Sequence, residues 1–123
     1  MATTDVSERL SRLEALSEIR DCMMRYARGM DRRDRALLRS AYHDGAVDDH
    51  IGFVGEVDDF IDWAFAYHST QTRYQHYLLN HTAEVNGDEA HSKTYYLFVW
   101  HRSRSSQPHH AFGWPLRRPH GAP

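Results

Sequence analysis

The chain has a single cysteine, Cys22, and no proline before Pro108. One cysteine excludes an internal disulfide framework and a zinc site built from several thiolates, and it fits a reducing cytoplasm. The first residues show no basic segment followed by an apolar run, so no signal peptide is predicted. No apolar stretch is long enough to span a bilayer. These absences predict a cytoplasmic protein with no membrane partner.

A strong net charge is also lacking. The 15 basic and 17 acidic residues give a formal net charge of -2, which offers no reason to expect nucleic acid as a partner. Acidic residues are absent after Glu89, and all four prolines lie at or beyond Pro108. This shift predicts one folded domain over residues 1–102 and an atypical tail over 103–123, with one short strand at His110–Trp114.

Apolar residues at helical spacing predict a long amphipathic helix over 6–30. Asp34 can cap a second, shorter helix over 35–42, and a third helix is predicted from 57 to about 68–69. An extended piece over 46–52 separates the last two helices. The chain therefore begins as a mainly helical unit and turns to strands later.

Two strands are predicted around the turn Asn86-Gly87-Asp88-Glu89, because Asn-Gly is the strongest short-range hairpin signal. A turn that opposes Val85 to Asp88, or to Ala90, makes even positions of the first strand face odd positions of the second. A three-residue loop would reverse that relation. Under the first condition, one sheet face holds Tyr74, His76, Leu78, Asn80, Tyr95, Leu97, Val99 and His101.

The candidate chemical groups are Asp31, Asp49, His50, His76 and His101. A histidine is the natural general base near neutral pH, and a carboxylate fixes its tautomer and stabilises the imidazolium. Such a set suits proton abstraction next to a carbonyl, followed by loss of water or another leaving group. This chemistry needs neither a metal nor an organic cofactor, and no metal-ligand spacing is present, so neither is expected. Taken singly, each residue also fits a structural role, such as a helix cap or a core histidine.

Three segments carry a resemblance to a known family: Tyr26-Ala27-Arg28-Gly29-Met30-Asp31-Arg32-Arg33-Asp34, Val47-Asp48-Asp49-His50 and Tyr74-Gln75-His76-Tyr77. Over about 13–102, the chain resembles the SnoaL-like branch of the nuclear transport factor 2-like superfamily, near scytalone dehydratase and hexachlorocyclohexane dehydrochlorinase. The resemblance implies an α+β fold: a cone-shaped, curved antiparallel sheet wrapped around N-terminal helices, with a deep pocket inside.

The family's last two strands are not recognisable after Arg102, so the C-terminal strands are expected to be missing or altered. An incomplete sheet has an exposed edge, which favours a homo-oligomer, either a dimer or a trimer.

The resemblance also implies a site. His76 would be the base, Asp31 would orient it, and His101 would act on the leaving group. The dehydratase's second pocket histidine lies 25 residues beyond its first, as His101 does beyond His76. The implied substrate-binding residues are Tyr26, Tyr42, Asp49, His50, Tyr74, Leu78 and Val99.

The implied activity is that of a cofactor-independent lyase, dehydratase-like, or an isomerase, and its partner is a small hydrophobic cyclic or aromatic molecule. Met30 and His50 stand where the dehydratase has tyrosines, so scytalone itself is not the expected substrate. Two alternatives stay open. One is a non-catalytic small-ligand-binding or structural subunit of the same fold. The other uses a carboxylate alone, Asp31 or Asp49, as the base.

Overall fold

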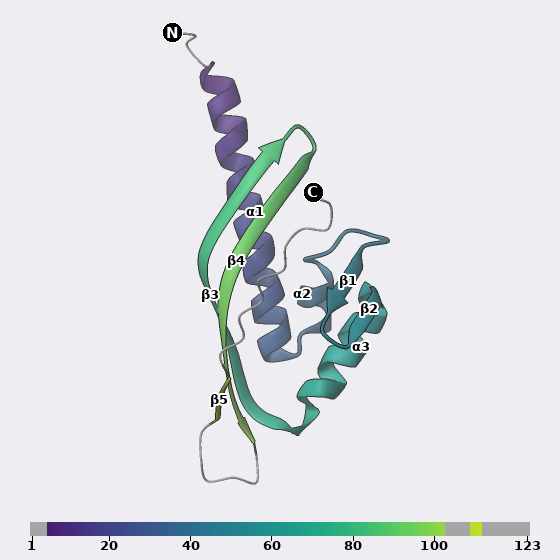
Figure 1. Cartoon of the computed structure of the whole chain (residues 1–123). Coiled ribbons are helices and arrows are strands. Elements are labelled where there is room, and N and C mark those ends of the chain that lie inside the picture. Colours follow the sequence, from purple (N-terminus) through teal and green to yellow (C-terminus); the bar gives the residue numbers. More distant parts are fainter. Residues whose placement is uncertain (1–4, 103–108, 112–123) are drawn as a thin grey trace, which may run out of the picture.

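The computed structural model describes residues 5–102 and 109–111 (Figure 1). Among them the strands pair antiparallel in two sheets, β1–β2 and β3–β4–β5. In chain order the elements are α1 (Val6–Arg32), α2 (Arg35–Arg39), β1 (Val47–His50), β2 (Phe53–Glu56), α3 (Val57–Tyr67), the 3-10 turn η1 (His68–Thr70), β3 (Gln71–Asn86), β4 (Glu89–Arg102) and β5 (His109–Ala111). The predicted α+β class is confirmed. The described residues do not show a cone, because the two sheets are separate.

The predicted helices are present, and α2 is shorter than predicted. The Asp34 side chain caps α2 by accepting a hydrogen bond from Leu37 N at 3.0 Å. The helix ends at Arg39, where the Ser40 hydroxyl donates to Leu37 O at 2.6 Å. Serine favours helix ends because its side chain competes for backbone partners in this way. The short helix places Ala41 and Tyr42 in a turn that leads toward β1.

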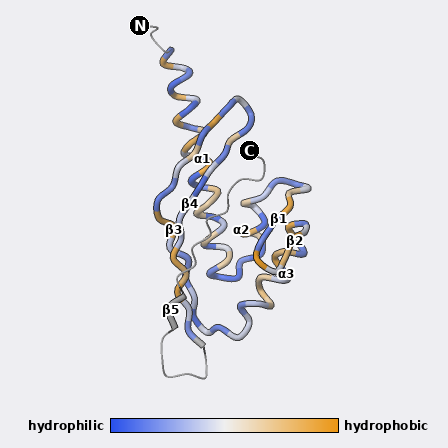
Figure 2. Tube along the Cα trace, viewed as in Figure 1, coloured by the Kyte–Doolittle hydropathy of each residue, from blue (hydrophilic) through white to orange (hydrophobic). Residues whose placement is uncertain are grey.

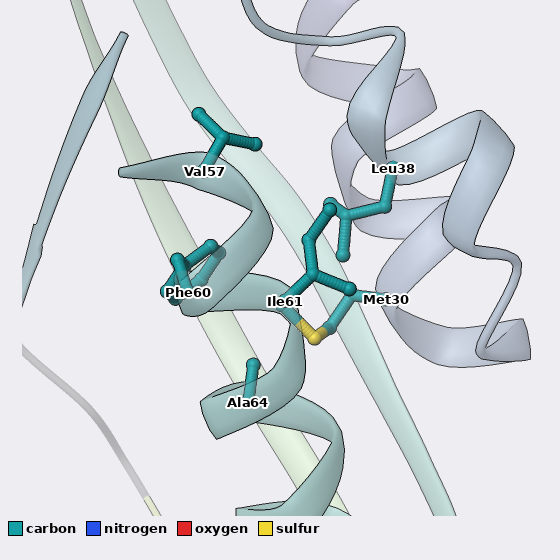
Figure 3. Close-up of a cluster of buried hydrophobic side chains, with 6 residues drawn as sticks. All are labelled: Met30, Leu38, Val57, Phe60, Ile61 and Ala64. Atoms are coloured by element: carbon teal, nitrogen blue, oxygen red, sulfur yellow. The ribbon is translucent and has the colours of Figure 1, made fainter. Parts of the chain in front are cut away.

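The core lies where α1, α2 and α3 meet (Figure 3). α1 and α2 approach closely because Gly29 has no side chain there. A Cβ built at Gly29 would lie 2.5 Å from Leu38 N. The six buried apolar residues of the core are Met30, Leu38, Val57, Phe60, Ile61 and Ala64. This core fixes the C-terminal end of α1, from which Asp31 projects.

β3 and β4 form a long hairpin beside α1 (Figure 1), with a hydrophilic turn at its far end (Figure 2). Val85 faces Ala90, one of the two registers predicted from the turn. A β-bulge then sets Leu79 and Asn80 against the single residue Tyr95, so Leu78 faces Tyr96. From there on, even positions of β3 face even positions of β4.

The predicted shared face of the hairpin is therefore wrong beyond the bulge. His76 faces Phe98, while His101 faces Arg73 and points to the other side of the sheet. The bulge has a clear packing role. It leaves two consecutive exposed residues, Leu79 and Asn80, so that His76 and His81, on either side of it, both stay on the partly buried face.

Only β5 is described beyond Arg102, and it pairs with Phe98–Trp100 of β4. It overlaps the predicted strand His110–Trp114, whose last three residues lie outside the described residues. The division at residue 102 stays a prediction. Within 5–102 and 109–111, no helix has both the length and the apolar character needed to cross a membrane.

Candidate active site

Asp31 and His76 form a closely bonded pair between the last turn of α1 and β3. The Asp31 carboxylate accepts from the His76 ring, with Nδ1 2.6 Å from Oδ1. It also accepts from His76 N, at 3.1 Å to Oδ1 and 3.0 Å to Oδ2. The side chains are 17% and 12% exposed, respectively. Because a carboxylate only accepts, Nδ1 carries the ring hydrogen and Nε2 is left as a basic atom.

Further contacts attach β3 to the end of α1. The Tyr74 hydroxyl donates to Met30 O at 2.9 Å, and Arg33 Nε donates to the Tyr74 hydroxyl at 3.2 Å. Arg33, the C-cap of α1, has φ 52° and also donates to His68 O. These bonds hold the helix end and the strand together, so the Asp31–His76 geometry is set by the surrounding fold.

His76 lines a cavity of about 650 Å³ that lies between the helical unit and the β3–β4 hairpin. Its ring lies 4.6 Å from that of Phe98, centroid to centroid. The aromatic residues of the lining are Tyr26, Tyr42, Phe60, Trp63, Tyr67, Tyr96 and Phe98. A mainly apolar and aromatic wall with a few polar groups is typical of sites for small hydrophobic molecules.

A second polar cluster borders the same cavity. The Tyr42 hydroxyl donates to Asp48 Oδ2 at 2.6 Å, the His50 ring bonds through Nδ1 to Asp48 Oδ1, and the Tyr26 hydroxyl lies 3.3 Å from His50 Nε2. Burial, and then the negative charge of Asp48, raises the pKa of Tyr26. Burial, followed by the neighbouring Tyr26 and the bond to Asp48, raises the pKa of Tyr42. Both hydroxyls therefore stay protonated and can act as donors.

The structure brings most of the predicted site residues to this cavity. Its lining includes Tyr26, Tyr42, Asp49, His50, His76 and Leu78. Asp31 stands behind His76 and holds its ring. Tyr74 instead stacks on His68, with ring centroids 4.6 Å apart.

His101 and Val99 do not line this cavity. They border a second, open groove of about 1080 Å³, whose lining also includes Tyr74, Asp31 and His76. His101 is exposed there, on the face opposite to the His76 ring. Asp31, His76 and His101 all border the open groove, whereas of the three only His76 lines the aromatic cavity, so a shared catalytic cavity stays a prediction. A catalytic role for His101 stays a prediction without support from this geometry.

Sequence reasoning missed Asp48 and His68. It chose Asp49 from the Asp48-Asp49-His50 cluster, yet Asp48 is the buried member, at 8% exposure. Strand alternation was the available signal, because residues two apart share a face and Asp48 therefore accompanies His50. His68 sits in η1, where the sequence predicted only the end of the third helix.

His68 is a buried histidine that lines the cavity, and its burial disfavours the protonated form of the ring. It is 7% exposed, and its Nδ1 lies 2.7 Å from Gln71 Oε1. Burial lowers the pKa of His68. The unfolded chain then binds a proton more readily than the folded one, so stability is lost as the pH falls below the ordinary histidine pKa of about 6.5.

We expect His68→Phe, which keeps a ring against Tyr74, to weaken this acid destabilisation. Urea unfolding at pH 7.5 and at successively lower pH should show a smaller loss of unfolding free energy in the variant than in the natural protein. His91→Phe, at an exposed site on β4, is the matched control and should keep the natural slope. An identical slope in His68→Phe would show that His68 does not cause it.

Three further findings describe the chain. Among the residues that the structure describes, no group of three or more His, Cys, Asp or Glu side chains is placed to hold a metal ion. A family model described as a SnoaL-like domain matches residues 11–116, past the predicted boundary at 102. No curated protein and no solved structure matches the chain significantly.

Proposed function

Because the chain belongs to the SnoaL-like domain family, within the nuclear transport factor 2-like superfamily and with small-molecule enzymes among its members, we propose that it is a cofactor-independent lyase or isomerase. Its substrate is a small hydrophobic cyclic or aromatic molecule with an acidic C–H next to a carbonyl. The closer kinship to scytalone dehydratase and hexachlorocyclohexane dehydrochlorinase is part of this proposal. The observation that carries it is the Asp31–His76 pair at the wall of an aromatic cavity.

In the proposed reaction His76 Nε2 removes the proton from carbon. Asp31 keeps the hydrogen on Nδ1 and stabilises the imidazolium that forms. Asp31 is not itself the base, since both of its oxygens already accept hydrogen bonds from His76. This argues against the alternative in which the Asp31 carboxylate works alone.

The structural-subunit alternative is less well supported. A fold that serves only for assembly has no need of an open interior, whereas here about 650 Å³ is left beside a positioned imidazole. A small-ligand-binding role without chemistry shares the cavity but gives no reason for the Asp31–His76 bond. The predicted homo-oligomer stays a prediction beside this proposal.

The proposal is tested by a thermal-shift screen against small cyclic and aromatic alcohols and ketones, followed by turnover assays of every hit. We expect His76→Ala to lower kcat by about 10²–10⁴-fold while the thermal shift by the ligand is retained. His91→Ala, which removes an exposed imidazole, should leave kcat unchanged. Undiminished turnover by a folded His76→Ala variant would refute the assignment of the base.

A further inference from the structure

The cluster of Tyr42, Asp48, His50 and Tyr26 is a continuous chain of hydrogen bonds that ends at the cavity. Asp48 accepts from Tyr42 and from the His50 ring, and its side chain is 9% exposed. The His50 side chain is 41% exposed, so the imidazole borders open space. It also stacks on Phe60, with ring centroids 4.6 Å apart, which fixes its plane. The Asp31–His76 pair does not use any of these groups.

The protonation state of His50 sets the direction of this chain. With Nδ1 bonded to Asp48, neutral His50 presents Nε2 as an acceptor, and the Tyr26 hydroxyl donates to it. When His50 is protonated, Nε2 becomes a donor to the Tyr26 oxygen. The Tyr26 hydrogen is then released to point at a ligand in the cavity. In that state the His50 ring keeps its bond to the Asp48 carboxylate through Nδ1.

We propose that Asp48, His50 and Tyr26 form a proton relay that protonates a departing hydroxyl group, so the substrate loses water and not a halide. This inference rests on the proposed function and specifies its leaving group. Tyr26 is the catalytic donor, because it lines the cavity and its hydroxyl contacts His50. His50 and Asp48 act through it as positioning residues and as the proton source.

The proton and electron balance is complete without a co-reactant. His76 takes the proton from carbon, and the C–H electron pair forms the new C=C bond. The C–O bond breaks, and its electron pair leaves on oxygen. That oxygen takes the Tyr26 hydrogen and departs as water, while His50 passes its proton to Tyr26. The imidazolium at His76 and the neutral His50 then return to their starting states by exchange with solvent.

The relay discriminates between leaving groups because hydroxide is a poor leaving group and chloride is a good one. A departing hydroxide requires a proton in the transition state, whereas a departing chloride does not. An enzyme for dehydrochlorination needs a base alone. A buried carboxylate, an imidazole and a phenol in series are explained by the elimination of water.

The test uses a matched pair of substrates, a cyclic β-hydroxy ketone and the corresponding β-chloro ketone. We expect His50→Gln and Tyr26→Phe each to lower kcat on the hydroxy substrate by about 10²–10⁴-fold. On the chloro substrate, kcat should stay within about threefold of the natural protein, because no proton is needed. His76→Gln should abolish both reactions. Tyr77→Phe and His91→Gln, at exposed sites, are the matched controls.

The pH profile supplies a readout that a purely structural role would not move. The pH profiles of turnover on the two substrates should differ, because only the hydroxy substrate draws a proton from the relay. Equal losses on both substrates in His50→Gln, or no loss on either, would overturn the relay. If His76→Gln abolishes both reactions while His50→Gln and Tyr26→Phe change neither, the proposed function is supported and the relay is overturned.

If the natural protein turns over neither substrate, the proposed function fails, and the relay is decided by ¹⁵N NMR of the imidazoles. We expect His50 Nδ1 to carry a hydrogen bonded to Asp48, and the His50 Nε2 resonance to move in Tyr26→Phe. Asp48→Asn should change the Nδ1 resonance, whereas Asp59→Asn, at an exposed site on α3, should not. An Nε2 resonance unaffected by Tyr26→Phe would overturn the relay.

Discussion

Asp31→Asn is expected to lower kcat by about 10²–10⁴-fold, although residue 31 does not line the substrate cavity. Asp31 accepts three hydrogen bonds from His76, and asparagine has one acceptor oxygen and a donor group in place of the second. The amide nitrogen would face a donor, so the ring must rotate or move its hydrogen to Nε2. Either change removes the basic atom from the cavity.

The expected pattern separates positioning from binding. Asp31→Asn should lower kcat with little change in KM, because the cavity wall is intact. The buried mismatch should also cost about 1–3 kcal/mol of unfolding free energy, so assays belong well below the melting temperature. Asp59→Asn, which makes the same change at an exposed site on α3, should leave kcat and KM unchanged. A loss confined to KM would show that Asp31 serves ligand binding and not His76.

Gly29→Ala is expected to lower the unfolding free energy by about 2 kcal/mol or more, against the usual direction for such a change in a helix. Helix propensity alone favours alanine by about 1 kcal/mol. Here the added Cβ would lie 2.5 Å from Leu38 N and 2.7 Å from Leu38 Cα. Leu38 is fully buried in the core, so α2 cannot shift without disrupting packing. The steric cost therefore exceeds the propensity gain.

Gly45→Ala separates this clash from backbone strain. Gly45 has φ +74° with nothing within 4 Å of a built Cβ, so only the left-handed backbone opposes alanine, at about 1–2 kcal/mol. Chemical denaturation of both variants gives the comparison. Gly29→Ala should also lower kcat, because Asp31 lies on the same turn of α1. A stabilised Gly29→Ala protein would contradict the close approach of α1 and α2.

The sequence was sufficient to predict the three helices and the Asp31–His76 pair of the site. Helical periodicity and the Asp34 cap located α1, α2 and α3, because these patterns depend on neighbours a few residues apart. The family resemblance placed Asp31 near His76, and the structure shows the two side chains bonded. Asp31 lies in α1 and His76 in β3, so a resemblance in these two regular elements is enough to predict that the residues lie close together.

Long-range register was not predictable from the turn. The Val85–Ala90 pairing was one of two predicted options, but the bulge at Leu79 and Asn80 shifted the register by one residue and moved His101 to the other face. No glycine or proline marks that bulge, and two exposed residues in succession are the only trace it leaves. Asp48 was overlooked for a different reason. Strand alternation places it on the same face as His50, but which face of β1 packs inward depends on the rest of the fold.

The central claim is that His76 removes a carbon-bound proton inside the cavity, and hydrogen exchange in D₂O tests it most directly. A cyclic ketone that binds the protein is followed by NMR for loss of the C–H signal next to the carbonyl. The account predicts exchange accelerated by the natural protein and by the control His91→Gln, and exchange at the rate of buffer alone with His76→Gln. Equal acceleration by His76→Gln, folded and binding the same ketone, would contradict it.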